Sequence, residues 1–137
     1  MAIIICDIDD TLLRNGVQPI KKTIDWINER SKNYTIVIVT GRPRSDRQKT
    51  VAALKRVGVK YNRLIMNPGS TASSPEYKGE VAKRLKSQSR VVLAVENNAA
   101  ARAAYQKAGV KAVHPSSLTD GMLKMTILFG GQDAVRY

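Results

Sequence analysis

The sequence has very little of two residue types that often build cross-links and metal sites. Cys6 is its only cysteine, so no internal disulfide can form. Because Cys6 lies within an apolar run, we interpret it as a small buried thiol, which suits a reducing compartment. His114 is the only histidine, and at the end of an apolar segment it is interpreted as incidental rather than catalytic.

Long hydrophobic runs are also missing. No stretch approaches the roughly 20 consecutive apolar residues that a membrane-spanning helix needs. The apolar run at residues 1–6 is too short for the core of a signal peptide, follows no basic leader and ends in acidic residues. We therefore expect a cytoplasmic protein without a membrane partner.

Acidic residues are scarce relative to basic ones. The 11 Asp and Glu residues and 23 Lys and Arg residues give a formal net charge of +12 at pH 7. Such an excess attracts polyanions, so nucleic acid is a candidate partner, although many basic proteins carry charge only for solubility. Aromatic residues make up 5% of the chain, so this binding would be mostly electrostatic and weakly sequence-specific, with little base stacking.

The chain does contain enough apolar residues for one core. Hydrophobic residues make up 43% of it and are spread along its length, which excludes a mostly disordered protein. The chain has 137 residues and no internal repeat, low-complexity tract or linker. We therefore expect a single domain over residues 1–137.

Apolar runs of β-branched residues alternate with segments of helical periodicity. Strands are predicted at residues 2–8, 34–39, 63–66, 90–95 and 110–113, and helices at residues 19–30, 46–57, 76–85 and 98–108. Pro19 is expected at a first helical position, and Val51 is expected to face the core. Residues 67–74 are predicted to form a loop, whereas residues 122–129 fit either a helix or a strand. The alternation predicts an α/β fold with a three-layer, doubly wound parallel sheet and a ligand site at the carboxyl ends of its strands.

Acidic residues follow the first predicted strand directly, in the sequence Asp7-Ile8-Asp9-Asp10-Thr11. Carboxylates two residues apart at a strand end can face one small site, where their repulsion favours a divalent cation such as Mg²⁺. One such carboxylate can attack phosphorus while its neighbour transfers protons. Taken alone, the segment also fits a plain acidic turn.

An apolar strand followed by D-x-D-x-T resembles the first motif of the haloacid dehalogenase superfamily of phosphotransferases. The other motifs of that superfamily are matched in order. Thr40 ends the second strand and precedes Gly41, Lys78 stands near the start of a helix, and Glu96-Asn97 follows the fourth strand. Singly, Thr40 fits a turn former and Lys78 a surface charge, but four motifs in order on alternating strands are specific.

The resemblance implies roles for these residues within a Rossmann-like core. Asp7 would be the nucleophile, Asp9 would transfer protons, and Thr40 and Lys78 would hold and neutralise the phosphoryl group. The other implied assignments are the Mg²⁺ ligands Asp7, Asp9, Glu96 and Asn97 and the substrate-binding residues Thr11 and Gly41.

The resemblance covers residues 2–114, with two departures. Glu96-Asn97 stands where the superfamily has an acidic pair, so one charge is lost and Mg²⁺ is expected to bind less tightly. Asp10 stands where many members have glycine, and an Asp tolerates such turn geometry.

Three features bear on the substrate. The spacing of the motifs leaves no room for a cap domain, so the site is expected to be open to large substrates. Residues 78–83 and 96–110 are similar to the phosphatase domain of the polynucleotide kinase-phosphatase family. Arg42, Arg44 and Arg47 follow Thr40 directly. We expect these arginines to bind substrate phosphates, with a solvated loop as the alternative.

These features predict a Mg²⁺-dependent phosphatase that acts through an aspartyl-phosphate and removes the terminal 3′-phosphate from nucleic acid. One alternative is a phosphatase of nucleotides or other small phosphate esters. Another is a catalytically weak nucleic-acid-binding protein with the same fold. The sequence does not distinguish DNA from RNA or 3′ from 5′ ends, and it leaves the oligomeric state open.

Overall fold

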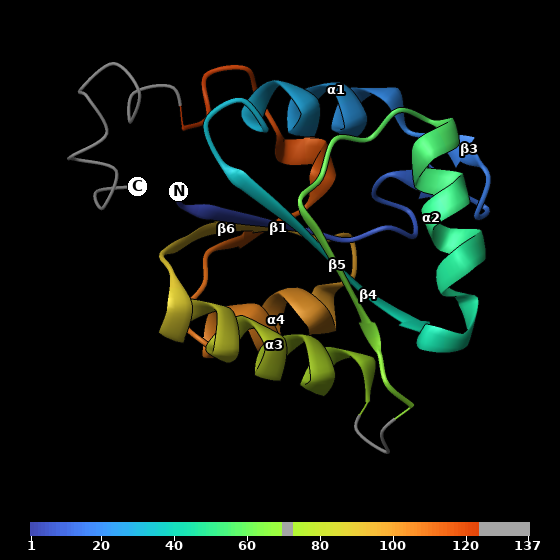
Figure 1. The fold of residues 1–137 in the computed structure, drawn as a ribbon. Helices are drawn as coiled ribbons and strands as arrows, with labels where there is room; N and C mark the ends of the chain where they lie inside the picture. The colour runs from blue at the N-terminus through green and yellow to red at the C-terminus, as the bar shows by residue number, and fades with distance from the viewer. Residues whose placement is uncertain (70–72, 124–137) are drawn as a thin grey trace.

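A five-stranded parallel sheet forms the centre of the protein, in the strand order β5-β4-β1-β6-β7 (Figure 1). The computed structural model describes residues 1–69 and 73–123. The five strands are β1 (Ile3–Cys6), β4 (Thr35–Pro43), β5 (Arg63–Asn67), β6 (Val91–Val95) and β7 (Ala112–Val113). Every neighbouring pair of strands in this sheet is parallel. The predicted α/β fold class is confirmed.

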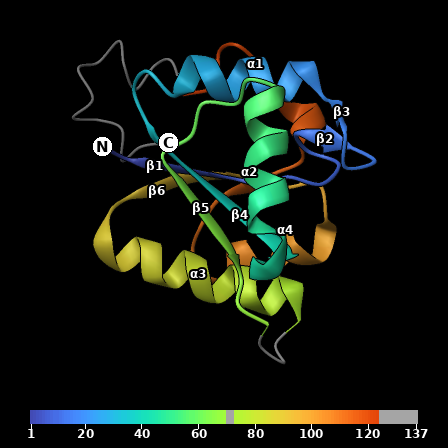
Figure 2. The ribbon, with the colours of Figure 1, turned by 45° about the vertical axis from the view of Figure 1, so that its right-hand side comes forward.

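Helices cover both faces of the sheet. Figures 1 and 2 show α1 (Lys21–Arg30) and α2 (Arg47–Arg56) on one face, with α3 (Ser74–Gln88) and α4 (Ala99–Lys107) on the other. In β1, Ile4 and Cys6 join the core beneath α1 and α2, whereas its other two side chains join the core beneath α3 and α4. Burial on both faces explains why this strand is an unbroken apolar run.

The connection between β1 and α1 differs from the expectation. It contains a short antiparallel hairpin of β2 (Leu13–Arg14) and β3 (Gln18–Pro19). The helix starts at Lys21, so Pro19 is not its first residue, and the preceding Ile20 supplies no side-chain cap. The prediction for Pro19 was therefore wrong, because proline also suits the end of a short strand that needs no further ladder hydrogen bond.

The orientation of α2 also differs. Thr50 and Leu54 are its buried residues, one turn apart, while Val51 is exposed. The expectation that Val51 faces the core was wrong, because a helix has one inward stripe and here a threonine occupies it.

The described residues contain no cap domain. Between β1 and β4 there are only the hairpin and α1, and between β4 and α3 the described elements are a 3₁₀ turn, α2 and β5. None of the helices in the described part of the chain has both the length and the apolar character of a membrane span. Most of the ambiguous segment at 122–129, and residues 70–72 of the predicted loop, lie outside the described residues.

Candidate active site

Seven of the eleven predicted functional residues converge where β1, β4 and β6 end. They border a cavity of about 340 Å³, which we call the Asp7 cavity. Its lining residues are Asp7, Asp9, Asp10, Gly41, Arg42, Ser74, Pro75, Lys78, Glu96, Asn97, Asn98 and Ala101. Parallel strands bring their carboxyl ends to one edge of the sheet, which is why segments far apart in sequence meet here.

Asp7 lies at the bottom of this cavity, and only 5% of its surface is exposed. Its backbone N–H donates to the Val95 carbonyl at 3.0 Å, which ties the end of β1 to β6. The Lys78 ammonium donates to Oδ1 at 2.9 Å, and the Thr11 hydroxyl donates to Oδ2 at 3.1 Å. Both carboxylate oxygens therefore have a fixed direction.

Lys78 also donates to Glu96 Oε1 at 2.6 Å, so one ammonium pairs with two buried carboxylates. Glu96 is fully buried, and its other oxygen, Oε2, accepts from the Asn98 backbone N–H at 3.1 Å. Arg102 donates to the backbone carbonyls of Glu96 and Asn97 at 3.0 and 2.7 Å and so fixes the loop after β6. No sequence pattern predicted the Lys78–Glu96 pair or the role of Arg102.

Burial and charge shift the titration of this cluster. Burial raises the pKa of Asp7 to about 7, and the Glu96 charge adds to this effect while the Lys78 charge opposes it. Burial alone would lower the pKa of Lys78, but the charges of Asp7 and Glu96 outweigh it and raise that pKa. When Asp7 and Glu96 are both ionised, the cluster has one negative charge more than Lys78 balances.

Asp9 lies at the more exposed rim of the cavity and is paired with Arg42. Arg42 Nε donates to Asp9 Oδ2 at 3.0 Å and Arg42 Nη2 donates to Oδ1 at 2.7 Å, a bidentate contact. Arg42 Nη1 also donates to the Thr50 hydroxyl at 3.3 Å. The hydrogen bond to Asp9 raises the pKa of Arg42. The sequence placed both residues at the site but did not predict that they pair.

Thr40 and Thr11 lie behind the lining of the cavity, and both are buried. The Thr40 hydroxyl oxygen accepts from the Arg42 backbone N–H at 3.1 Å. Gly41 packs against the start of α3, where a Cβ would collide with the Ser74 side chain. These residues shape the end of β4 around the site.

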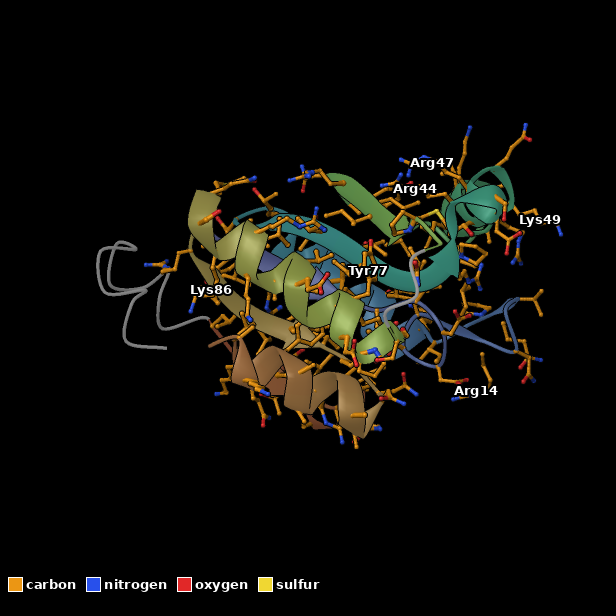
Figure 3. The ribbon with its side chains drawn as sticks, turned by 90° about the horizontal axis from the view of Figure 1, so that it is seen from below. Arg14, Arg44, Arg47, Lys49, Tyr77 and Lys86 are labelled. Carbon is orange, nitrogen blue, oxygen red and sulfur yellow. The ribbon has the colours of Figure 1, made fainter. Side chains whose placement is uncertain are left out.

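The structure does not bring Arg44 and Arg47 into the Asp7 cavity. They border a second cavity of about 320 Å³ together with Arg63 and Arg84, which we call the arginine cavity. Figure 3 shows Arg44 and Arg47 beside β5, with Tyr77 of α3 near them. The expectation that these two arginines bind phosphates of the substrate stays a prediction.

Comparison with known proteins decides the family. A family model described as haloacid dehalogenase-like hydrolase matches residues 4–104, a range that includes Asp7, Thr40, Lys78 and Glu96. The chain belongs to the haloacid dehalogenase-like hydrolase family. No curated protein sequence matches this hydrolase.

Solved structures share the fold of this hydrolase. Two chains from structures of a Pnkp1/Rnl/Hen1 complex, one described as an RNA repair complex, align with TM-scores of 0.68 and 0.73 at 18% and 16% identity. The match covers 82% of the hydrolase but only 42% and 45% of those chains. The core domain of a candidate phosphoglycolate phosphatase from Streptococcus pneumoniae TIGR4 aligns with a TM-score of 0.55 at 15% identity, covering 93% of the hydrolase and 94% of that chain.

The donor set of the hydrolase fits the implied Mg²⁺. In the described residues, no group of three His, Cys, Asp or Glu side chains is placed to hold an ion by itself. Mg²⁺ needs only one or two carboxylates, because phosphate and water complete its shell. Asp7, Asp9, Glu96 and Asn97 all line the cavity. Both oxygens of Asp7 and both of Glu96 already accept hydrogen bonds, but each carboxylate oxygen keeps a second lone pair for an ion. Four lining carboxylates against two cationic side chains leave the surplus of negative charge that a divalent cation would balance.

Proposed function

We propose that this hydrolase is a Mg²⁺-dependent phosphatase that transfers a phosphoryl group to Asp7 and then to water. The observation that carries the proposal is the fixed Asp7 carboxylate, 2.9 Å from the Lys78 ammonium and in the same cavity as Asp9. A buried carboxylate with both oxygens oriented is preorganised for attack, and the cation beside it offsets the charge of the incoming phosphate.

The reaction has two steps, transfer of the phosphoryl group to Asp7 and hydrolysis of the aspartyl-phosphate. First, an Asp7 oxygen bonds to phosphorus and the bond from phosphorus to the leaving oxygen breaks. Asp9, protonated once it has left its contact with Arg42, gives its proton to that oxygen. Then the Asp9 carboxylate takes a proton from water as the water oxygen bonds to phosphorus. The bond between Asp7 and phosphorus breaks, so phosphate leaves and both carboxylates return to their starting states.

Other residues orient and neutralise the phosphoryl group. Lys78 balances charge beside the nucleophile, and the Thr40 hydroxyl is available to donate to a phosphate oxygen. Asp7, Asp9, Glu96 and Asn97 are the residues that would hold Mg²⁺, which when bound supplies positive charge to the phosphate oxygens.

For the substrate, we propose a terminal phosphate of nucleic acid, with the 3′-phosphate preferred. Asp7 lies deep in its cavity, so a phosphate with a single ester bond reaches it more easily than a phosphodiester flanked by two sugars. The net charge of +12 favours a polyanion. The fold likeness to Pnkp1, a component of an RNA repair complex, supports the same choice.

A second candidate is a phosphatase of nucleotides or other small esters. Its support is the size of the Asp7 cavity, about 340 Å³, which is within the range of small-molecule sites. The fold likeness to a candidate phosphoglycolate phosphatase adds to it.

A phosphate-release panel tests the proposal. The substrates are oligonucleotides with a 3′-phosphate or a 5′-phosphate, a mononucleotide and an aryl phosphate, each with Mg²⁺ and with EDTA. We expect release from the 3′-phosphorylated oligonucleotide to be fastest, to need Mg²⁺ and to fall by several orders of magnitude in Asp7→Asn, whose amide cannot act as the nucleophile. Retained turnover in a folded Asp7→Asn protein, or in EDTA, would contradict the mechanism. Preference for the mononucleotide would favour the second candidate.

A further inference from the structure

The arginine cavity brings four guanidinium groups together from four elements. Arg44 lies in the 3₁₀ turn η1 (Arg44–Asp46), Arg47 starts α2, Arg63 starts β5, and Arg84 lies on α3. All four residues are exposed, and the cavity that they border measures about 320 Å³. The described residues that line it include no acidic side chain.

In the described residues, three of these four arginines make no side-chain hydrogen bond, and Arg47 donates only to the Leu64 carbonyl, at 3.2 Å. Arg42 pairs with Asp9, and Arg102 donates to two backbone carbonyls of the loop after β6. None of the four arginines of the cavity pairs with an acid in the described residues, although Glu80 lies one turn before Arg84 on α3. Four like charges around one cavity repel each other, and a bound anion would relieve that repulsion.

The floor of the cavity is apolar and well packed. Leu64, Met66 and Leu85 are buried there, and the Tyr77 hydroxyl donates to the Met66 carbonyl at 2.6 Å. Burial raises the pKa of Tyr77, and the charges of Arg84 and Arg44, which line the same cavity, oppose that shift. An apolar floor limits screening by water and so strengthens the attraction of the arginines for an anion.

The arginine cavity is directly linked to the Asp7 cavity along the chain. Arg42 lines one cavity and Arg44 the other, and an extended chain separates residues two apart by no more than about 7 Å. On α3, Lys78 faces the Asp7 cavity while the preceding Tyr77 lines the arginine cavity. A strand whose end enters one cavity would therefore pass the other.

We propose that the arginine cavity is a second phosphate-binding site, which holds a backbone phosphate of the nucleic-acid strand whose terminal phosphate enters the Asp7 cavity. This inference rests on the proposed function for the position of the strand end. Guanidinium groups bind phosphodiesters bidentately, and contacts to the backbone alone make the binding independent of base sequence. The arginines would bind the oxygens of a phosphate group, and a free phosphate ion offers the same oxygens as a backbone phosphate does.

The test measures binding apart from hydrolysis. The probe is a labelled single-stranded oligonucleotide that ends in a 3′-hydroxyl, and its Kd is followed by fluorescence anisotropy as salt is raised. The variant is Arg63→Ala with Arg84→Ala, two positions outside the Asp7 cavity. The matched control is Lys107→Ala with Lys111→Ala, which removes the same charge from exposed residues that line neither cavity.

We expect the arginine variant to bind more weakly and to lose about 0.7 from its salt slope for each phosphate contact removed, while the control keeps the wild-type slope. Equal slopes in both variants would overturn the proposal, as would absence of binding by the wild-type protein. A third arm adds inorganic phosphate. In one outcome, phosphate raises the Tm of the wild-type protein but not of the arginine variant, while the two proteins show the same salt slope for the oligonucleotide. In that case the site binds a free anion and the strand proposal fails.

Aryl-phosphate turnover by the wild-type protein separates this inference from the proposed function. Turnover without strand binding would overturn the inference and leave the phosphatase standing. Strand binding with the expected slopes but without turnover would contradict the phosphatase and support the arginine cavity as a phosphate site.

Discussion

The Asp7 cavity and the arginine cavity are neighbours with opposite charge. Among the described residues, charged side chains pair with one another in the Asp7 cavity but not in the arginine cavity. The first has four carboxylates and two cationic side chains, and the second has four arginines and no acid among its described lining residues. In the first cavity Asp7, Lys78 and Glu96 are buried, and both carboxylates accept a hydrogen bond from the Lys78 ammonium. In the second the arginines are exposed, and only Arg47 makes a side-chain hydrogen bond, to the Leu64 carbonyl at 3.2 Å.

The difference follows from burial, which decides whether a charged side chain is stabilised by a protein partner or by water. A buried charge without a partner costs several kcal/mol, so the buried residues of the Asp7 cavity must pair within the protein. Exposed guanidinium groups are solvated by water and can stay unpaired until a ligand arrives. Substitutions in the Asp7 cavity should therefore change stability and turnover together, whereas substitutions in the arginine cavity should act on ligand binding.

The largest expected effect is on turnover, at the rim of the Asp7 cavity. Asp9→Asn removes the proposed proton-transfer group, so we expect phosphate release to fall by about 10²–10⁴-fold. Asp10→Asn is the matched control, because it also removes one lining carboxylate and asparagine tolerates the positive φ of 61° at that position. Steady-state kinetics compare the two variants. Equal losses would mean that total charge, and not proton transfer, is what matters.

The next largest effect concerns stability and compares two residues of α3. Lys78→Ala leaves Asp7 and Glu96 without their shared cation, so we expect a loss of about 3–5 kcal/mol in the free energy of unfolding. Arg84→Ala removes the same charge from an exposed position without an ion pair, and the expected change is within about 0.5 kcal/mol. Urea denaturation measures both. Similar losses for the two variants would contradict the claim that charged residues of the Asp7 cavity stabilise the fold more than those of the arginine cavity.

A smaller effect should appear as a change of stability with pH in the metal-free protein. Burial raises the pKa of Asp7 from 3.8 to about 7, so the folded state holds this proton more tightly than the unfolded state. The stability that Asp7 contributes when protonated is present below about pH 4 and is lost as pH rises through about 7. Asp7→Asn has no such charge, so in EDTA it should have a higher Tm than the wild-type protein at pH 8 and a smaller advantage at pH 5.

Thermal unfolding with EDTA and with Mg²⁺ checks this prediction. Mg²⁺ binds the charged form of Asp7, so adding it should reduce the advantage of the variant at pH 8. A wild-type Tm that exceeds that of Asp7→Asn by the same margin at both pH values would contradict it.

The smallest expected effect is on the metal requirement. Asn97→Asp restores the acidic pair of the family and should lower the Mg²⁺ concentration needed for half-maximal phosphate release by a few-fold. Asn98→Asp adds the same charge one residue away, where the side chain caps α4 by accepting from the Ala101 N–H at 2.8 Å. If both variants shift the Mg²⁺ titration equally, the shift comes from the added negative charge near the site, and residue 97 is not a Mg²⁺ ligand.

The fold was predictable because β1, β6 and most of β4 are buried on both faces and so appear as apolar runs. The short hairpin β2–β3 was not, because two-residue strands show no periodicity. Asn15 and Gly16, both with positive φ, mark its turn and were the available signal. Val51 was misplaced because apolar character alone does not fix the phase of a short helix.

The site, like the fold, has features that the sequence predicts and features that depend on tertiary packing. Asp7, Thr40 and Glu96 follow or end strands, so their meeting at one sheet edge follows from the order of the motifs. The pairing of Arg42 with Asp9 spans 33 residues and depends on side-chain geometry at the rim. The arginine cavity depends on tertiary packing of η1, α2, β5 and α3, and no sequence pattern linked Arg63 to it.

Gly41 shows how little sequence variation the end of β4 can accept. Any other residue would add a Cβ that collides with the Ser74 side chain at the start of α3. Rotation of the Ser74 hydroxyl relieves the closest approach, but the Ser74 Cβ, 3.2 Å from the added atom, must still shift slightly at the start of the helix that places Lys78 against Asp7. A library of random substitutions selected for phosphate release should therefore retain glycine at position 41, although this residue has no side chain to offer the substrate.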